Sequence, residues 1–145
     1  MKTIAFLFIL IGSVVFCQTG MNWRDAKIRS CKTFAECVTR ADGTDLHRRK
    51  VQFYDAAIAL WKSSDTQEAR ARVLYLRAVS LIREAKGDTG FKGDSSTILK
   101  VTHTDEYKDK AFADAKEDLD TALSVGKGLE GAQKRDAEKL LKEID

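Results

Sequence analysis

Residues 66–86, TQEARARVLYLRAVSLIREAK, are expected to form the most apolar helix of the chain. The apolar positions occur on nearly every side of this helix: Val73, Leu74, Leu76, Ala78, Val79, Leu81 and Ile82. A helix that is apolar nearly all round is normally packed between neighbours. We therefore expect this segment to be the central helix of the domain.

The composition also favours helices. The chain has 145 residues and contains no proline. Proline costs about 3 kcal/mol in a helix interior, so long helices have the strongest reason to exclude it. With 43% hydrophobic and 32% charged residues, the chain is of neither a disordered nor a multi-span membrane type. The sequence therefore predicts one all-α domain.

Four further helices are expected around the central one, from apolar residues spaced three and four positions apart. They cover residues 22–41, 45–63, 105–125 and 129–144. Ser64 or Asp65 is expected to cap the central helix, with Glu68 completing a capping box. The sequence thus predicts about five helices.

A long connection, GDTGFKGDSSTILKVTHT at residues 87–104, separates the third and fourth of these helices. Its glycines and aspartates predict an inserted loop, and the β-branched residues of 97–104 favour a short strand or hairpin arm. A loop of this length in a small domain is normally either functional or disordered.

The N-terminal segment 1–17, MKTIAFLFILIGSVVFC, has the pattern of a secretory signal peptide. Lys2 precedes an apolar run that is shorter than a typical membrane span. Cleavage after Cys17 would leave residues 18–145 as a single helical domain that is periplasmic or secreted. The alternative is that Cys17 is lipidated and anchors the protein to a bacterial envelope.

Export would place Cys31 and Cys37 in an oxidising compartment, where disulfides form. On one continuous helix, six residues advance about 9 Å, and the two sulfur atoms would face different sides. Either the helix breaks between the two residues or both are buried thiols. We favour buried thiols or a strained bond over a structural disulfide.

Two pairs of segments repeat one spacing of large and small residues. The first helices share a large residue, a pair ending in alanine and another large residue: Cys31, Phe34, Ala35 and Val38, then Leu74, Arg77, Ala78 and Leu81. The second helices share a small residue with a larger one four positions later: Ala57 and Trp61, then Ala115 and Leu119, followed by Ala122. The small residues would let paired helices approach closely.

This pattern resembles the tetratricopeptide repeat, whose helix pairs follow W-x2-L-G-x2-Y and then A-x3-F. The matching positions in the two motifs are Leu74, Ala78 and Leu81, then Ala115, Leu119 and Ala122. The resemblance covers most of residues 28–125, and the last helix is similar to the family's capping helix. The closing proline of the family is missing here, and the connections are longer than a 34-residue unit allows.

The resemblance implies antiparallel helix pairs stacked as a short array, with a groove that binds a protein or peptide partner. The inner faces of the first helices would contact that partner, and Arg77 would bind one of its carboxylates. Tyr75 and Arg70 complete the expected partner-binding set. A membrane contact is expected only if Cys17 is lipidated.

No enzyme motif occurs in the chain: HExxH, GxSxG, the P-loop and GxGxxG are all missing. His47 and His103 have no Cys, Asp or Glu at a ligand spacing, and His47, in the basic run HRRK, is expected on a solvated face. Asp88 and Asp94 lack the register of a calcium loop. We therefore expect no catalysis, no cofactor and no bound metal.

Charge is distributed unevenly along the chain. Residues 22–50 carry eight basic and four acidic side chains, whereas residues 104–145 carry eight basic and twelve acidic ones. Ordinary solvated helix faces explain this, but so would contact with an acidic partner or head-to-tail association. The small net charge and the expected export argue against a nucleic-acid partner.

Two alternatives remain open. One is a small exported helical enzyme or ligand carrier, in which residues 87–104 form a lid and Trp61 and Tyr75 line a pocket. The other is a lipid-anchored bacterial envelope lipoprotein that is attached through Cys17.

Overall fold

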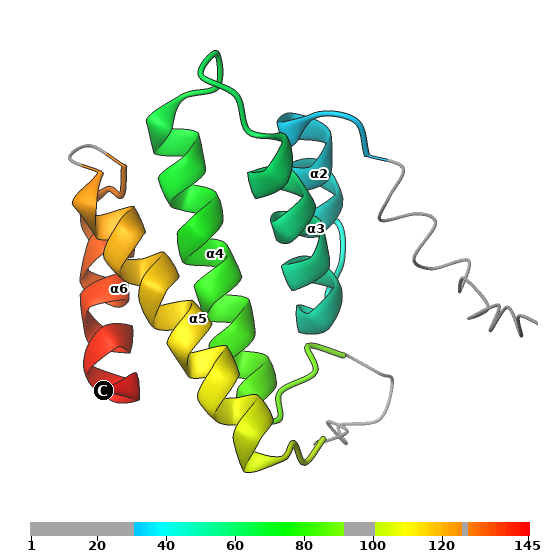
Figure 1. Cartoon of the computed structure of the whole chain (residues 1–145), viewed down its shortest axis with the longest axis vertical. Coiled ribbons are helices and arrows are strands. Elements are labelled where there is room, and N and C mark those ends of the chain that lie inside the picture. The colour runs from blue at the N-terminus through cyan, green and yellow to red at the C-terminus, as the bar shows by residue number, and fades with distance from the viewer. Residues whose placement is uncertain (1–30, 92–100, 126–127) are drawn as a thin grey trace, which may run out of the picture.

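The computed structural model describes residues 31–91, 101–125 and 128–145 of the chain (Figure 1). Within these ranges the protein has five helices and no strand: α2 (Phe34–Asp42), α3 (His47–Leu60), α4 (Gln67–Ala85), α5 (Asp105–Ser124) and α6 (Gly131–Ile144). The expected all-α class is confirmed. The segment predicted as a signal peptide, with Cys17, lies outside the described residues.

Four helices begin and end within about three residues of their predicted bounds. The residue that caps the N-terminus of α4 differs from the prediction. The Thr66 hydroxyl accepts a hydrogen bond from the Ala69 N–H at 3.1 Å, so Thr66 is the cap. Asp65 instead accepts a hydrogen bond from the Lys62 N–H at 2.8 Å and closes the preceding turn. The prediction that Ser64 or Asp65 caps this helix was therefore wrong.

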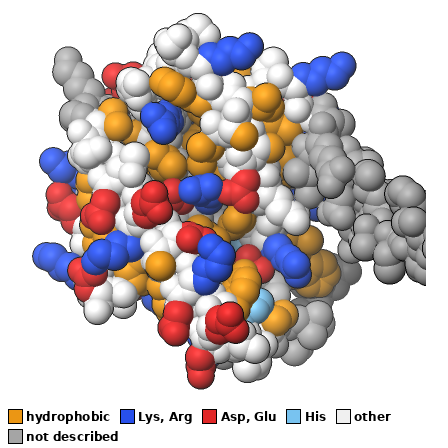
Figure 2. Space-filling view, in the orientation of Figure 1, with side chains coloured by type: hydrophobic (Ala, Val, Ile, Leu, Met, Phe, Trp, Pro, Cys, Tyr) orange, Lys and Arg blue, Asp and Glu red, His pale blue; other side chains and the backbone are white. Residues whose placement is uncertain are grey.

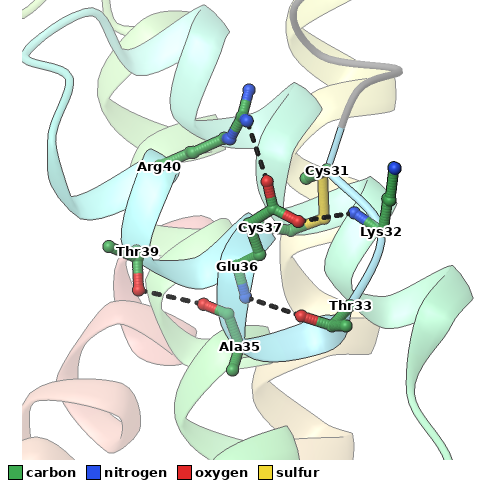
Figure 3. The surroundings of a disulfide bond; sticks show 8 residues. All are labelled: Cys31, Lys32, Thr33, Ala35, Glu36, Cys37, Thr39 and Arg40. Carbon is green, nitrogen blue, oxygen red and sulfur yellow. Dashed lines mark hydrogen bonds and ion pairs between the residues drawn. A yellow bond between two sulfur atoms is a disulfide. The ribbon is translucent and has the colours of Figure 1, made fainter.

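The start of α2 explains a second difference. Thr33 caps this helix by accepting a hydrogen bond from the Glu36 N–H at 3.2 Å, and residues 31–33 are not helical. Cys31 therefore precedes the helix while Cys37 lies inside it, and the two form a disulfide with a Cα–Cα distance of 5.3 Å (Figure 3). The prediction of buried thiols or a strained bond was wrong in its buried-thiol part, because the helix does not run through Cys31, which was the other possibility.

The first end of the long connection is bonded to the start of α3, and its two ends are bonded to each other. The His47 N–H donates to the Thr89 carbonyl at 3.1 Å, and the Val101 N–H donates to the Gly87 carbonyl at 3.4 Å. Residues 101–104 have no regular structure, so the predicted strand is not present there. The remainder of that prediction falls on residues 92–100, outside the described ranges.

Each helix makes its main contacts with the next one in the chain: α2 with α3, α3 with α4, α4 with α5, and α5 with α6. Successive helices run in alternating directions, and α4 stands between the α2–α3 pair and the α5–α6 pair (Figure 1). The expectation that residues 66–86 form the central helix is confirmed.

Two hydrophobic clusters meet at α4. One joins α2 and α3, with Phe34, Phe53 and Tyr54 as its buried aromatic members and Val73 contributed by α4. The other joins α4, α5 and α6, and much of it is alanine packed against larger side chains such as Leu119 and Ile82. Burial of apolar area on both sides of one helix therefore holds the described part of the chain together.

Candidate interaction groove

One face of α4 is left open to solvent. Arg72, Val79 and Arg83 lie on this face, because seven residues rotate the helix by about 700° and eleven by about 1100°, each close to a whole number of turns. Arg72 and Arg83 are exposed, and Val79 is half-buried between them. We call this face the floor of the groove, and the helices that flank it the walls of the groove.

The first wall of the groove is α2. Ala69 and Leu76, on one edge of the open face of α4, pack against the α2–α3 cluster, as does Val38 of α2 itself. The wall and the floor therefore belong to the first helices of two successive pairs.

The second wall is α6. The Tyr75 hydroxyl donates a hydrogen bond to Asp136 Oδ2 at 2.7 Å, and the Lys86 ammonium pairs with Glu143 Oε2 at 3.2 Å. Both contacts join α4 to α6. Lys86 follows Tyr75 along α4, and Glu143 follows Asp136 along α6. The two helices therefore run in the same direction along one side of the array.

The groove opens into a hollow of about 860 Å³ where α4 and α6 begin. Its lining comes from α2, α4 and the start of α6: Val38, Glu68, Ala69, Arg72, Gly128, Glu130, Gly131, Ala132 and Gln133. Residues of α2, α4 and α6 thus all contribute to the lining of this hollow, and Arg72 of the open face is among them.

The charges on this surface are not all free to meet a ligand. Glu143 is held by Lys86 and Lys139, while Asp136 accepts the Tyr75 hydroxyl. Burial and the hydrogen bond to Asp136 raise the pKa of Tyr75 to about 12, so its hydroxyl stays protonated and donating at neutral pH. Arg72 and Arg83 make no ion pair with any described residue, and their charges remain available.

Arg77, predicted as a partner contact, is instead bound inside the protein. Its Nε and Nη2 donate to the two carboxylate oxygens of Asp118 at 2.7 and 2.6 Å, and its Nη1 donates to Asp55 Oδ1 at 2.6 Å. This bidentate arrangement joins α3, α4 and α5. Its guanidinium is occupied by carboxylates of this chain, so we remove Arg77 from the partner-binding set.

The two Arg77 partners differ in burial. The Asp118 side chain is 3% exposed, whereas that of Asp55 is 52% exposed. Burial raises the pKa of Asp118, and the hydrogen bonds from Arg77 oppose that shift by stabilising the carboxylate. The Asp118 hydrogen bonds in turn raise the pKa of Arg77. The pair therefore fixes the α4–α5 contact.

The other two predicted partner residues, Tyr75 and Arg70, lie on different sides of α4. Tyr75 lies at the groove, on the α6 side. The Arg70 guanidinium lies over the Trp61 ring, 4.8 Å from its centroid, on the side of α4 opposite to Arg72. Trp61 packs with the α2–α3 cluster and Tyr75 with the α4–α6 cluster, so they do not line a shared pocket.

The residues predicted to pack the repeats are largely buried. Seven of them are at most 8% exposed: Ala57, Leu74, Ala78, Leu81, Ala115, Leu119 and Ala122. Trp61 is half-buried at the end of α3. Four of the seven are alanines, which is what close helix approach requires.

His47 is buried rather than solvated, and that prediction was wrong. Its side chain is 7% exposed because residues 88–90 lie over it, and its Nε2 is 3.5 Å from Asp88 Oδ2. Burial lowers the pKa of His47, so the ring is neutral at pH 7. Within the described ranges, no group of three or more His, Cys, Asp or Glu is placed to hold a metal ion.

Sequence reasoning missed Arg72, Val79 and Arg83 as a surface, although their spacing is visible in the sequence. The hydrogen bond between Tyr75 and Asp136 joins residues 61 positions apart, and no local pattern indicates it.

In the described part of the chain, no helix is both long and apolar enough to cross a membrane. Comparison with protein-family models, with characterised proteins and with solved structures found no match.

Proposed function

We propose that this protein is a non-enzymatic protein-interaction module, built as a short tetratricopeptide-like array that binds a partner segment in the α2–α4–α6 groove. The observation that carries the proposal is the open face of α4. It presents two arginines that make no ion pair with a described residue, about 16 Å apart along the helix, with a half-buried valine between them.

The order of the helices supports the repeat interpretation. Antiparallel neighbours in contact along the chain, with α4 and α6 parallel on one side, are what stacked helix pairs produce. Each pair then contributes its first helix to one concave surface. In such arrays the concave surface is where extended partners bind.

The charges indicate the kind of partner. Arg72 and Arg83 can each bind a carboxylate, and guanidinium groups do so with good geometry. Glu68 and Glu130 lie at the mouth of the hollow and would repel acidic groups there. The partner segment is therefore expected to place its carboxylates along the floor and a small apolar residue over Val79.

Two observations bear on the compartment. Residues 1–17 have the pattern of a signal peptide, and the Cys31–Cys37 disulfide is typical of an oxidising environment. We propose that the protein acts after export. Reduced cytosolic protein that lacks the disulfide and still binds its partner in the cytosol would argue against this.

The binding experiment uses crosslinking in the exported fraction, followed by titration of the captured segment into purified protein. Arg72→Glu combined with Arg83→Glu should weaken binding by at least about tenfold, because two charge pairs of up to about 1 kcal/mol each are reversed. Arg48→Glu is the control for a single charge reversal, since Arg48 is exposed on α3, outside the groove. Equal effects of both variants, or no captured segment, would refute the proposal.

A further inference from the structure

The outer face of α5 carries a row of unpaired carboxylates. Figure 2 shows the face of the molecule on which α5 lies, where acidic side chains are mixed with basic ones. Asp105 and Asp114 are bound by neighbouring lysines on α5. Four exposed carboxylates of α5 make no ion pair within the described chain: Glu106, Asp109, Glu117 and Asp120. We call these four residues, with the exposed Ala113 among them, the acidic stripe.

The acidic stripe and the groove floor have the same spacing. Glu106 and Glu117 are eleven residues apart, as are Arg72 and Arg83, which is about 16 Å along either helix. Ala113 follows Glu106 by seven residues, just as Val79 follows Arg72. Each surface therefore presents a charge, a smaller apolar residue and a second charge, and the signs are opposite.

The two surfaces cannot meet within one molecule. α5 buries Ala111, Ala115 and Leu119 against the inner cluster that it shares with α4, and its stripe faces away from that cluster. The open face of α4 lies on the side of the array lined by α2 and α6. Only the stripe of another copy can reach the groove floor.

We propose that the groove takes the acidic stripe of α5 from a second copy of this chain, so that the protein associates head to tail. This inference rests on the proposed function of the groove as a binding site. Because the stripe and the groove are different surfaces, the contact is heterologous and leaves one of each unused at the ends. Assembly continues as a chain, or closes if the rotation between copies permits a ring.

The association is weak and sensitive to salt. Exposed ion pairs contribute up to about 1 kcal/mol each and are screened at raised ionic strength. Burial of the small apolar centre adds little area. We therefore expect concentration-dependent association at low salt and monomers at high salt.

The test is sedimentation equilibrium of the full chain, purified with its disulfide intact, at several concentrations. Glu106→Lys with Glu117→Lys gives a copy with lysines at the two stripe positions that match the groove arginines, and Arg72→Glu with Arg83→Glu gives a copy with glutamates at those two groove positions. Each double variant alone should lose association by at least about tenfold. Mixing the two should restore it, because each then offers the other a complementary surface.

Glu138→Lys, a single charge reversal of the same kind on the exposed side of α6, is the control and should leave association unchanged. Circular dichroism of each variant checks that the helices are kept. A wild-type chain that stays monomeric at low salt, or a mixture that fails to associate, overturns the inference. If an acidic segment of another protein still binds and Arg72 and Arg83 are required, the inference about a second copy falls and the proposed function stands.

Discussion

Removing the carboxylate of Asp118 should destabilise the protein strongly. This side chain is 3% exposed and neutralises the Arg77 guanidinium, which is 22% exposed, through two hydrogen bonds of 2.6 and 2.7 Å. Asp118→Asn keeps the shape but leaves a largely buried cation with only the exposed Asp55 as a charged partner. Losing one member of a buried pair costs about 3 kcal/mol. For a domain of this size, Tm should fall by about 10 °C.

Two further variants test whether burial of the charge is the reason for the expected loss of stability. Asp55→Asn removes the other partner of Arg77, but this side chain is 52% exposed and the cost should stay below about 1 kcal/mol. Combining Arg77→Met with Asp118→Leu removes both charges, and apolar replacement of a buried pair is often close to neutral. The double variant should therefore be more stable than Asp118→Asn alone.

Urea unfolding followed by circular dichroism gives the free energy of each variant, and equal m-values would show that the same cooperative unit unfolds. The reasoning is refuted if Asp118→Asn costs no more than Asp55→Asn. It is also refuted if the double variant loses as much free energy of unfolding as Arg77→Met and Asp118→Leu lose together as single variants. The unpaired buried charge would then not be the cause of the destabilisation.

Three other perturbations have expected outcomes. Reducing the Cys31–Cys37 disulfide should lower the free energy of unfolding by about 2 kcal/mol, measured by urea unfolding with and without reductant. Gly90→Ala should cost at least about 1 kcal/mol, because φ is 74° and a Cβ would clash with the backbone carbonyl oxygen of Asp45, whereas Gly43→Ala, whose Cβ would make only ordinary van der Waals contacts, should be nearly neutral in the same assay. The depressed pKa of His47 means that the unfolded chain binds the proton more readily, so stability is full above about pH 6.5 and decreases as the pH falls toward the folded-state pKa. Thermal unfolding of His47→Gln across that window should show a weaker pH dependence than the wild type, and an unchanged slope would contradict this.

Helix positions could be predicted from the sequence because apolar spacing depends on local geometry. The bounds of α4 and α5 follow from residues that alternate between cluster and solvent within a few turns. The start of α2 could not be obtained this way. Apolar residues continue N-terminal to Thr33, so periodicity alone extended the helix, and only the Thr33 cap marks where it begins.

Partners that are distant in sequence account for the other differences. His47 has a polar neighbourhood in the sequence, and it is buried only because residues 88–90 return over the start of α3. Arg77 was assigned to a partner because its two carboxylate partners are 22 and 41 residues away. Such long-range pairs depend on how the helices pack, which a single-sequence pattern does not specify.

The arginines of α4 show how one helix serves both the fold and the proposed groove. Relative to Arg72, the rotation of 100° per residue places Arg83 at about 20° and Arg70 and Arg77 at about 140° to 160°. Arg70 and Arg77 lie where α4 meets its neighbours. There Arg70 lies over the Trp61 ring, and Arg77 binds Asp118 and Asp55. Arg72 and Arg83 lie where none of the five described helices covers α4, and neither makes an ion pair with a described residue. Rotational position, rather than residue type, therefore separates structural arginines from those available to a ligand, and the same reasoning places the unpaired carboxylates of α5 on its uncovered side.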